Sequence, residues 1–175
     1  MADIERPAPD TIRFERLLDA PVETVWRYLT DAELRGQWFA AGTVEPREGG
    51  ALELVFDHDA LSTDIVPYPE RFACSKGFVA CETVVRFEPP RVFAFTFEGQ
   101  GDSIATFELF PAGDRTRLVL THSGISSLAN CIDFGGGWHA HLAALEAKLA
   151  GGGVANFWAL HARSEALVAE ALGEG

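Results

Sequence analysis

The segment between residues 121 and 149 constrains the fold of this 175-residue chain more than any other. Residues 43–122 have the two-residue alternation of strands, whereas residues 138–149 have the period of a helix. The apolar residues of that helix fall on one narrow stripe: Trp138, Leu142, Leu145 and Leu149. A helix that follows a complete sheet can remove such a stripe from water only against a face of the sheet. The sequence therefore predicts an α+β fold with one late helix, which starts after the glycines at 135–137.

The amino-terminal part predicts a strand followed by two short helices. Residues 11–18 have strand character, and Pro21 suits the first position of a helix whose apolar residues recur at helical spacing. Asp31 can then cap a second short helix. Residues 1–10 are polar and contain two prolines, so we expect them to be disordered or irregular. We expect a single domain over residues 11–175.

The middle of the chain predicts an antiparallel meander with one apolar and one polar face. Alternation places these side chains on the inward face: Leu52, Leu54, Phe56, Cys81, Thr83, Val85, Phe87, Phe93, Phe95, Phe97, Phe107, Leu109, Leu118, Leu120 and His122. Short turns at 88–91, 99–102 and 111–114 join the strands. Residues 57–77 interrupt the rhythm and predict an irregular excursion, in which the Asp-His-Asp sequence at 57–59 is interpreted as a solvated loop.

A final helix is predicted from Val154 to Leu172. One of its faces carries Phe157, Leu160, Leu167 and Val168. The back of the preceding helix consists of small residues that let another helix approach closely, namely Ala140, Ala144 and Ala147. We therefore expect the final helix to pack on the domain through Phe157, Leu160 and Leu167, or to pair with its copy in a homodimer.

Charge and cysteine content exclude several classes of protein. Acidic residues outnumber basic ones by 26 to 14, for a net charge of −12, which disfavours binding to nucleic acid or to an anionic membrane. The sequence has neither the layout of a signal peptide nor an apolar run as long as a membrane span. Its three cysteines lack zinc-ligand spacing, which is typical of free thiols in a reducing compartment. We expect a cytoplasmic protein.

Several short segments resemble one protein family. Residues 19–26 (DAPVETVW), 29–31 (LTD) and 88–91 (EPPR) resemble the homologues of the activator of heat-shock-protein ATPase, within the START-like, Bet v 1-like superfamily. Further similarity is to a bacterial subgroup, at residues 56–58 (FDH), 61–62 (LS), 121–122 (TH) and 137–142 (GWHAHL). Together these segments cover roughly residues 11 to 150 in the family's order.

The resemblance implies the helix-grip fold, in which a curved antiparallel sheet wraps around the long carboxy-terminal helix and leaves a pocket for an apolar or amphipathic molecule. Relatives include ligand carriers, polyketide cyclase-like enzymes, drug-binding resistance proteins and co-chaperones. The eukaryotic co-chaperone carries an additional amino-terminal domain, for which this chain has no room. A chaperone partner is therefore not expected.

The candidate site lies between the sheet and the long helix. We expect these residues to bind the ligand: Trp38, Phe39, Phe56, Cys81, Phe95, Phe97, His122, Trp138 and His141. The cavity itself is expected to be bounded by Trp38, Phe95, His122 and Trp138. No nucleophile, phosphate-loop or zinc motif occurs, so we predict no catalytic residue, metal or cofactor.

Three functions follow from these features. The favoured one is binding of a small hydrophobic or amphipathic molecule. The first alternative is a cyclase- or hydrolase-like enzyme that uses His122 or His141 as acid or base, because imidazole exchanges protons near neutral pH. The second is a co-chaperone-like module that acts through its outer surface. A pocket with convergent polar groups favours the first two functions, and a filled core favours the third.

Overall fold

The computed structural model describes residues 3–97 and 102–173, so most of the turn predicted at 99–102 lies outside the described part. The elements in chain order are β1 (Ile4–Ala8), β2 (Thr11–Leu18), α1 (Val22–Thr30), α2 (Ala32–Gly36), β3 (Ala51–Val55), the 3₁₀-helices η1 (His58–Leu61) and η2 (Glu70–Ser75), β4 (Val79–Glu88), β5 (Val92–Thr96), β6 (Ile104–Ala112), β7 (Arg115–Ser123), α3 (Leu128–Leu149) and α4 (Phe157–Gly173).

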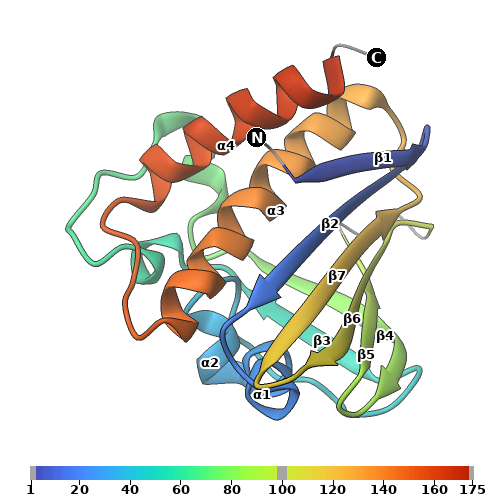
Figure 1. Cartoon of the computed structure of the whole chain (residues 1–175). Coiled ribbons are helices and arrows are strands. Elements are labelled where there is room, and N and C mark those ends of the chain that lie inside the picture. Colours follow the sequence, from blue (N-terminus) through green and yellow to red (C-terminus); the bar gives the residue numbers. More distant parts are fainter. Residues whose placement is uncertain (1–2, 98–101, 174–175) are drawn as a thin grey trace.

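The strands form one antiparallel sheet that curves around α3 (Figure 1). Its order is β1-β2-β7-β6-β5-β4-β3. All pairs are between strands that follow one another in the chain, except the pair of β2 with β7. The inward faces of the strands and the stripe of α3 meet in one core, in which Trp138, Leu142 and Leu145 are buried. This is the helix-grip fold that the family resemblance implies.

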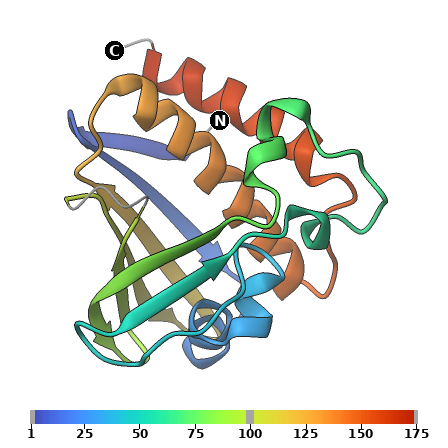
Figure 2. The same ribbon diagram turned by 180° about the vertical axis from the view of Figure 1, so that it is seen from behind.

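The two short helices after β2 also form as predicted. Asp31 caps α2, since its carboxylate accepts hydrogen bonds from the backbone N–H groups of Glu33 and Leu34, both at 3.0 Å. Val22, Val25 and Leu29 are the buried residues of α1. The two helices close one end of the curved sheet (Figure 2).

The long helix α3 begins at Leu128, ten residues before the predicted start. Ser127 caps it by accepting a hydrogen bond from the N–H of Asn130 at 3.1 Å, and the helix continues through the three glycines. A Cβ on Gly135 would lie 2.8 Å from Val168 Cγ1, and a Cβ on Gly136 would lie 2.7 Å from Glu165 Cγ. The first two glycines are therefore contact points for α4. The expectation that they mark the start of the helix was wrong.

We expect the glycines of α3 to respond in opposite ways to substitution by alanine. Gly136→Ala should lower the free energy of unfolding by roughly 1–3 kcal/mol, because the methyl group overlaps Glu165 of α4. Gly137→Ala should raise it by up to ~1 kcal/mol, because open space surrounds the new methyl group and alanine favours the helix. Urea denaturation of both variants tests this, and equal shifts would contradict it.

The amino terminus is more ordered than predicted. Residues 4–8 form strand β1, which pairs with β2 through Ile4 opposite Phe14 and Glu5 opposite Arg13. The expectation of a disordered or irregular segment over residues 1–10 is therefore corrected for β1. Proline suits such a strand because β1 lies at the edge of the sheet, where N–H groups on one side need no partner.

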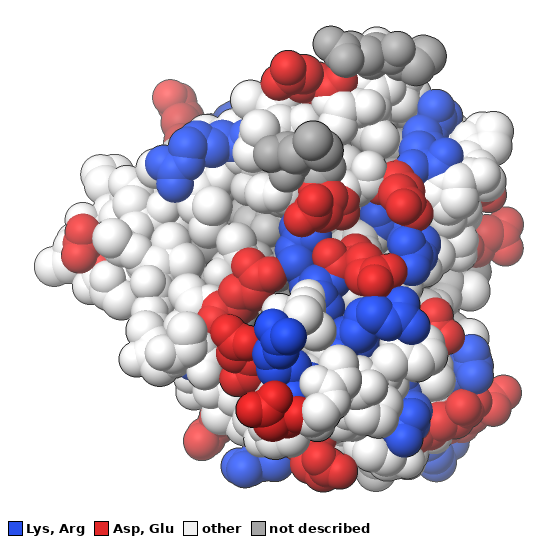
Figure 3. Space-filling view, viewed as in Figure 1, with Lys and Arg blue, Asp and Glu red and all other residues white. Residues whose placement is uncertain are grey.

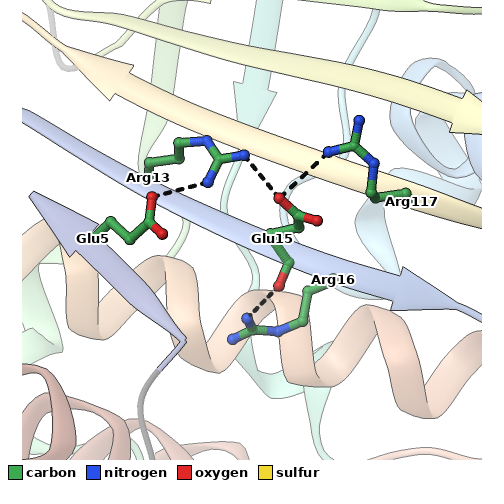
Figure 4. Close-up of polar contacts among 5 residues, drawn as sticks. All are labelled: Glu5, Arg13, Glu15, Arg16 and Arg117. Carbon is green, nitrogen blue, oxygen red and sulfur yellow. Dashed lines mark hydrogen bonds and ion pairs between the residues drawn. The ribbon is translucent and has the colours of Figure 1, made fainter. Parts of the chain in front are cut away.

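Ion pairs cover the outer face of β1, β2 and β7 (Figure 4). Arg13 bridges Glu5 at 2.9 Å and Glu15 at 2.8 Å, and Arg117 approaches Glu15 at 3.3 Å. Exposed pairs of this kind contribute about 0–1 kcal/mol each. Figure 3 shows charges of both signs interleaved over this face, which is therefore the solvated side of the sheet.

A β-bulge reverses the predicted facing of the first half of β4. The pairing with β5 shifts between Val84 and Arg86. Before the bulge, Glu82 and Val84 are buried, whereas Cys81 and Thr83 are exposed. The inward placement of Cys81 was therefore wrong, because simple alternation continued from Phe87 does not allow for an inserted residue.

The final helix α4 packs along α3, but not through all of the predicted residues. Phe157 and Val168 are fully buried, Leu160 is half-buried, and Leu167 is 37% exposed. The prediction for Leu167 was wrong. The buried face instead includes Trp158 and His161, two aromatic side chains with polar ring nitrogens.

Candidate functional site

An aromatic cavity of about 180 Å³ lies between α3, the excursion (residues 57–77) and the first turns of α4. Its walls come from residues far apart in the sequence: Phe39, Phe56, His58, Phe72, Ser75, Phe78, Phe97, Asp133, Phe134, Gly137, Trp138, His141, Trp158 and His161. Figures 1 and 2 both place the excursion beside α4. The fold thus closes one side of the cavity with the excursion and α4.

Five of the predicted ligand-binding residues line this cavity: Phe39, Phe56, Phe97, Trp138 and His141. Trp38 and Phe95 do not, because both are buried in the core, and Trp38 Nε1 donates a hydrogen bond to the carbonyl of Tyr28 at 2.8 Å. Cys81 lies outside the cavity, among exposed residues of β4. The cavity is therefore displaced from its predicted position. It lies beside the excursion, and Trp38, Phe95 and His122 do not line it.

His122 is a core residue whose two ring nitrogens are both occupied. Trp138 Nε1 donates to its Nδ1 at 3.1 Å, so the ring proton is on Nε2, which lies 2.7 Å from Ser103 Oγ. Burial lowers the pKa of His122 to about 4. A histidine held in one tautomer by two neighbours, and fully buried, orients Trp138.

His141 keeps one nitrogen available. Its Nδ1 lies 2.8 Å from the carbonyl oxygen of Trp38, which can only accept, so Nδ1 carries the proton. Nε2 is then the nitrogen with a lone pair on this cavity-lining ring. Burial, followed by the neighbouring His58, lowers the pKa of His141 to about 3. At neutral pH this side chain is an uncharged hydrogen-bond acceptor.

His58 is buried, contrary to the interpretation of residues 57–59 as a solvated loop. Its Nδ1 lies 2.8 Å from Tyr68 Oη, and its ring lies 4.8 Å from the ring of Trp158 and 5.7 Å from that of His141. Burial lowers the pKa of His58 to about 4. A sequence signal did exist, because an irregular segment that carries Tyr68 and Phe72 needs a buried side.

The helix α4 contributes Trp158 and His161 to the cavity wall, and sequence analysis assigned neither to the site. His161 Nδ1 is 3.6 Å from Glu165 Oε2, and Arg71 also pairs with Glu165. Burial lowers the pKa of His161, while Glu165 opposes this shift. Within the described part of the chain, Trp158 Nε1 and His161 Nδ1 are buried without a hydrogen-bond partner.

The described residues contain no group of three or more histidine, cysteine, aspartate or glutamate side chains placed to hold a metal ion. Among the described helices, none is long and apolar enough to cross a membrane.

Comparison with known proteins identifies the family. The family model described as "Activator of Hsp90 ATPase homolog 1-like protein" matches residues 19–150. The chain belongs to this family. None of the curated proteins compared with it matches.

Solved structures of family-like fold support this assignment. A protein of Bordetella parapertussis, solved in solution by NMR, is 43% identical, with 94% of this chain and 87% of that chain covered and a TM-score of 0.80. CalU16 from Micromonospora echinospora, solved as a crystal, is 25% identical, with 93% and 88% covered and a TM-score of 0.68. A protein of Nitrosomonas europaea at 20% identity, with 83% and 97% covered and a TM-score of 0.63, shares the fold.

The helix α4 lies beyond the residues that the family model matches. Trp158 and His161 therefore close the aromatic cavity from outside the segment that defines the family. The segment that the family model matches supplies Phe97, Trp138 and His141, and the residues after it supply Trp158 and His161.

Proposed function

We propose that this protein binds a small, largely apolar molecule in the aromatic cavity. The observation that carries the proposal is a cavity of about 180 Å³ whose wall includes eight phenylalanine and tryptophan side chains. A cavity of about 150 Å³ with apolar walls holds benzene, whereas sites for drug-sized ligands have about 300–1,000 Å³. The volume therefore favours a ligand with one or two rings and disfavours long lipids.

The state of the histidines favours binding over acid–base catalysis. A general base works best when its pKa is near the working pH, and burial lowers the pKa of His141 to about 3. His122, the other candidate, uses both ring nitrogens in the core. Enzymatic use of either residue receives no support from this geometry, and His141 Nε2 is better suited to accept a hydrogen bond from a bound molecule.

Gly137 offers a direct test, because it lines the cavity and open space surrounds the position of an added Cβ. Gly137→Leu should fill part of the cavity and reduce the affinity for one- and two-ring aromatic compounds at least tenfold. Binding is measured by thermal shift and by calorimetry on a panel of such compounds, since a ligand of the folded state raises the melting temperature.

Gly137→Ala is the matched control, because it changes the same helix position with a much smaller side chain. Its binding should stay within about threefold of the original chain, since one methyl group removes little of the volume. Unchanged binding in the leucine variant, with a normal far-ultraviolet spectrum, would place the ligand elsewhere. Failure of the whole panel to bind the original chain would reject the proposal.

A homodimer and a cytoplasmic location remain predictions. The dimer is tested by sedimentation at several protein concentrations. The chaperone role in the family's name is not extended to this chain, and we expect no strong stimulation of a chaperone ATPase in a phosphate-release assay.

A further inference from the structure

Two groups of the aromatic cavity, His141 and Asp133, suit a ligand that donates a hydrogen bond at one end and carries positive charge at the other. This inference rests on the proposed function, because it specifies the ligand of the same cavity. It follows from the direction of the cavity, its charges and its walls.

The cavity runs along one face of α3. Asp133, Gly137 and His141 all line it, and they are four residues apart in turn, so they lie above one another on the helix. At 1.5 Å per residue, eight residues correspond to about 12 Å. Asp133 is exposed and His141 is buried, so the carboxylate marks the solvent side and the imidazole marks the inner end.

The charge around the cavity is negative. Within the described chain, Asp133 forms no ion pair, and no lysine or arginine lines the cavity. Arg71 and Lys76, which adjoin the lining residues Phe72 and Ser75 in the sequence, are already paired, Arg71 with Glu165 and Lys76 with Asp59. Asp57 and Asp59 raise the pKa of His58 against the effect of burial, so their negative potential reaches the cavity wall.

The walls are also suited to a cation. The face of an aromatic ring carries negative charge density, and rings that surround an ammonium group attract it. Eight phenylalanine and tryptophan side chains line the cavity, and the histidines among them are neutral at pH 7 because their pKa values are lowered. A carboxylate ligand would meet these ring faces and Asp133 with unfavourable electrostatics.

We infer that the aromatic cavity binds an aryl-alkylammonium cation, with its ring against Trp138, its ring hydroxyl donating to His141 Nε2 and its ammonium group at Asp133. A one-ring amine of this kind fits a cavity of about 180 Å³ that extends about 12 Å along α3. A neutral or anionic molecule of the same shape lacks the attraction to Asp133 and to the ring faces.

Three probes that share a phenol and differ at the other end test the inference: tyramine, tyrosol, which is neutral, and 3-(4-hydroxyphenyl)propanoate, which is anionic. Calorimetry at pH 7 and low salt should show tyramine binding at least tenfold more tightly than tyrosol, with the propanoate weakest. Asp133→Asn should reduce tyramine affinity threefold to tenfold and leave tyrosol unchanged. Asp114→Asn, which removes an equal charge from the β6–β7 turn, should change neither.

The outcomes separate the two proposals. Tyrosol or the propanoate binding as tightly as tyramine would overturn the inference of a cation and leave the proposed function standing. An equal loss of tyramine and tyrosol affinity in Asp133→Asn would also overturn it, because the carboxylate would then act through structure. If none of the three probes binds while other aromatic compounds do, the ligand class is wrong, and if nothing binds, both proposals fail.

Discussion

Lowering the pH from 7 to 5 should lower the free energy of unfolding by roughly 6 kcal/mol, because each of three buried histidines costs ~1.36 kcal/mol for every pH unit below 6.5. Burial lowers the pKa values of His58 and His122 to about 4 and that of His141 to about 3. In the unfolded chain the same groups titrate near 6.5.

The sign follows from the number of protons bound. Between pH 6.5 and about 4 the unfolded chain holds these protons and the folded chain does not, so stability falls as the pH falls through this window. Above pH 6.5 both states are neutral at these residues, and the contribution is fully present. Since small domains have 5–15 kcal/mol in total, the protein should be close to unfolding at pH 5.

Urea denaturation at pH 7, 6 and 5 measures this slope. In His122→Asn, the amide can accept from Trp138 and donate to Ser103, so the variant has one titrating histidine fewer at a similar site. Its stability should depend on pH about a third less steeply. Equal unfolding free energies at pH 7 and 5 in the original chain would show that these imidazoles take up protons in the folded state.

The order of elements was predictable because each has a local cause. The stripe of Trp138, Leu142 and Leu145 specifies where α3 is buried, and the Asp31 cap specifies where α2 begins. These features depend on residues three or four apart, which share a helix face, or on a side chain next to its own backbone partner. The family resemblance then gave the arrangement, which the sheet order and the family match confirm.

The parts that were not predictable depend on contacts between distant segments. In the sequence, Gly135 is typical of a residue that ends a helix. In the structure it lies within α3, where Val168, 33 residues later, packs against it. The bulge near Arg86 cannot be detected from the alternation of apolar and polar residues along the strand. Cys81 was therefore placed on the wrong face. The position of the cavity depends on the fold of the excursion over α4, which brings His58 onto Trp158.

Arg35 of α2 is the second site of large expected effect, and it is 1% exposed although it carries a guanidinium group. Burial lowers its pKa to about 10, so it stays charged at pH 7. The group donates to five backbone carbonyls from three segments: Leu29 of α1 at 3.3 Å, the consecutive Ala40 at 2.9 Å, Ala41 at 3.3 Å and Gly42, and Glu53 of β3 at 3.5 Å. It thereby ties the end of α1 to the chain that leads to β3.

Arg35→Met should lower the free energy of unfolding by roughly 3–5 kcal/mol, because the side chain keeps its length while buried carbonyls lose their donors. Arg35→Lys should recover only a small part, since one ammonium group cannot reach carbonyls that a planar guanidinium reaches together. Arg27→Met on the exposed face of α1 is the control, with an expected change within about 0.5 kcal/mol. Urea denaturation at pH 7 compares the three, and a loss below about 1 kcal/mol in Arg35→Met would mean that water or rearranged backbone replaces the guanidinium.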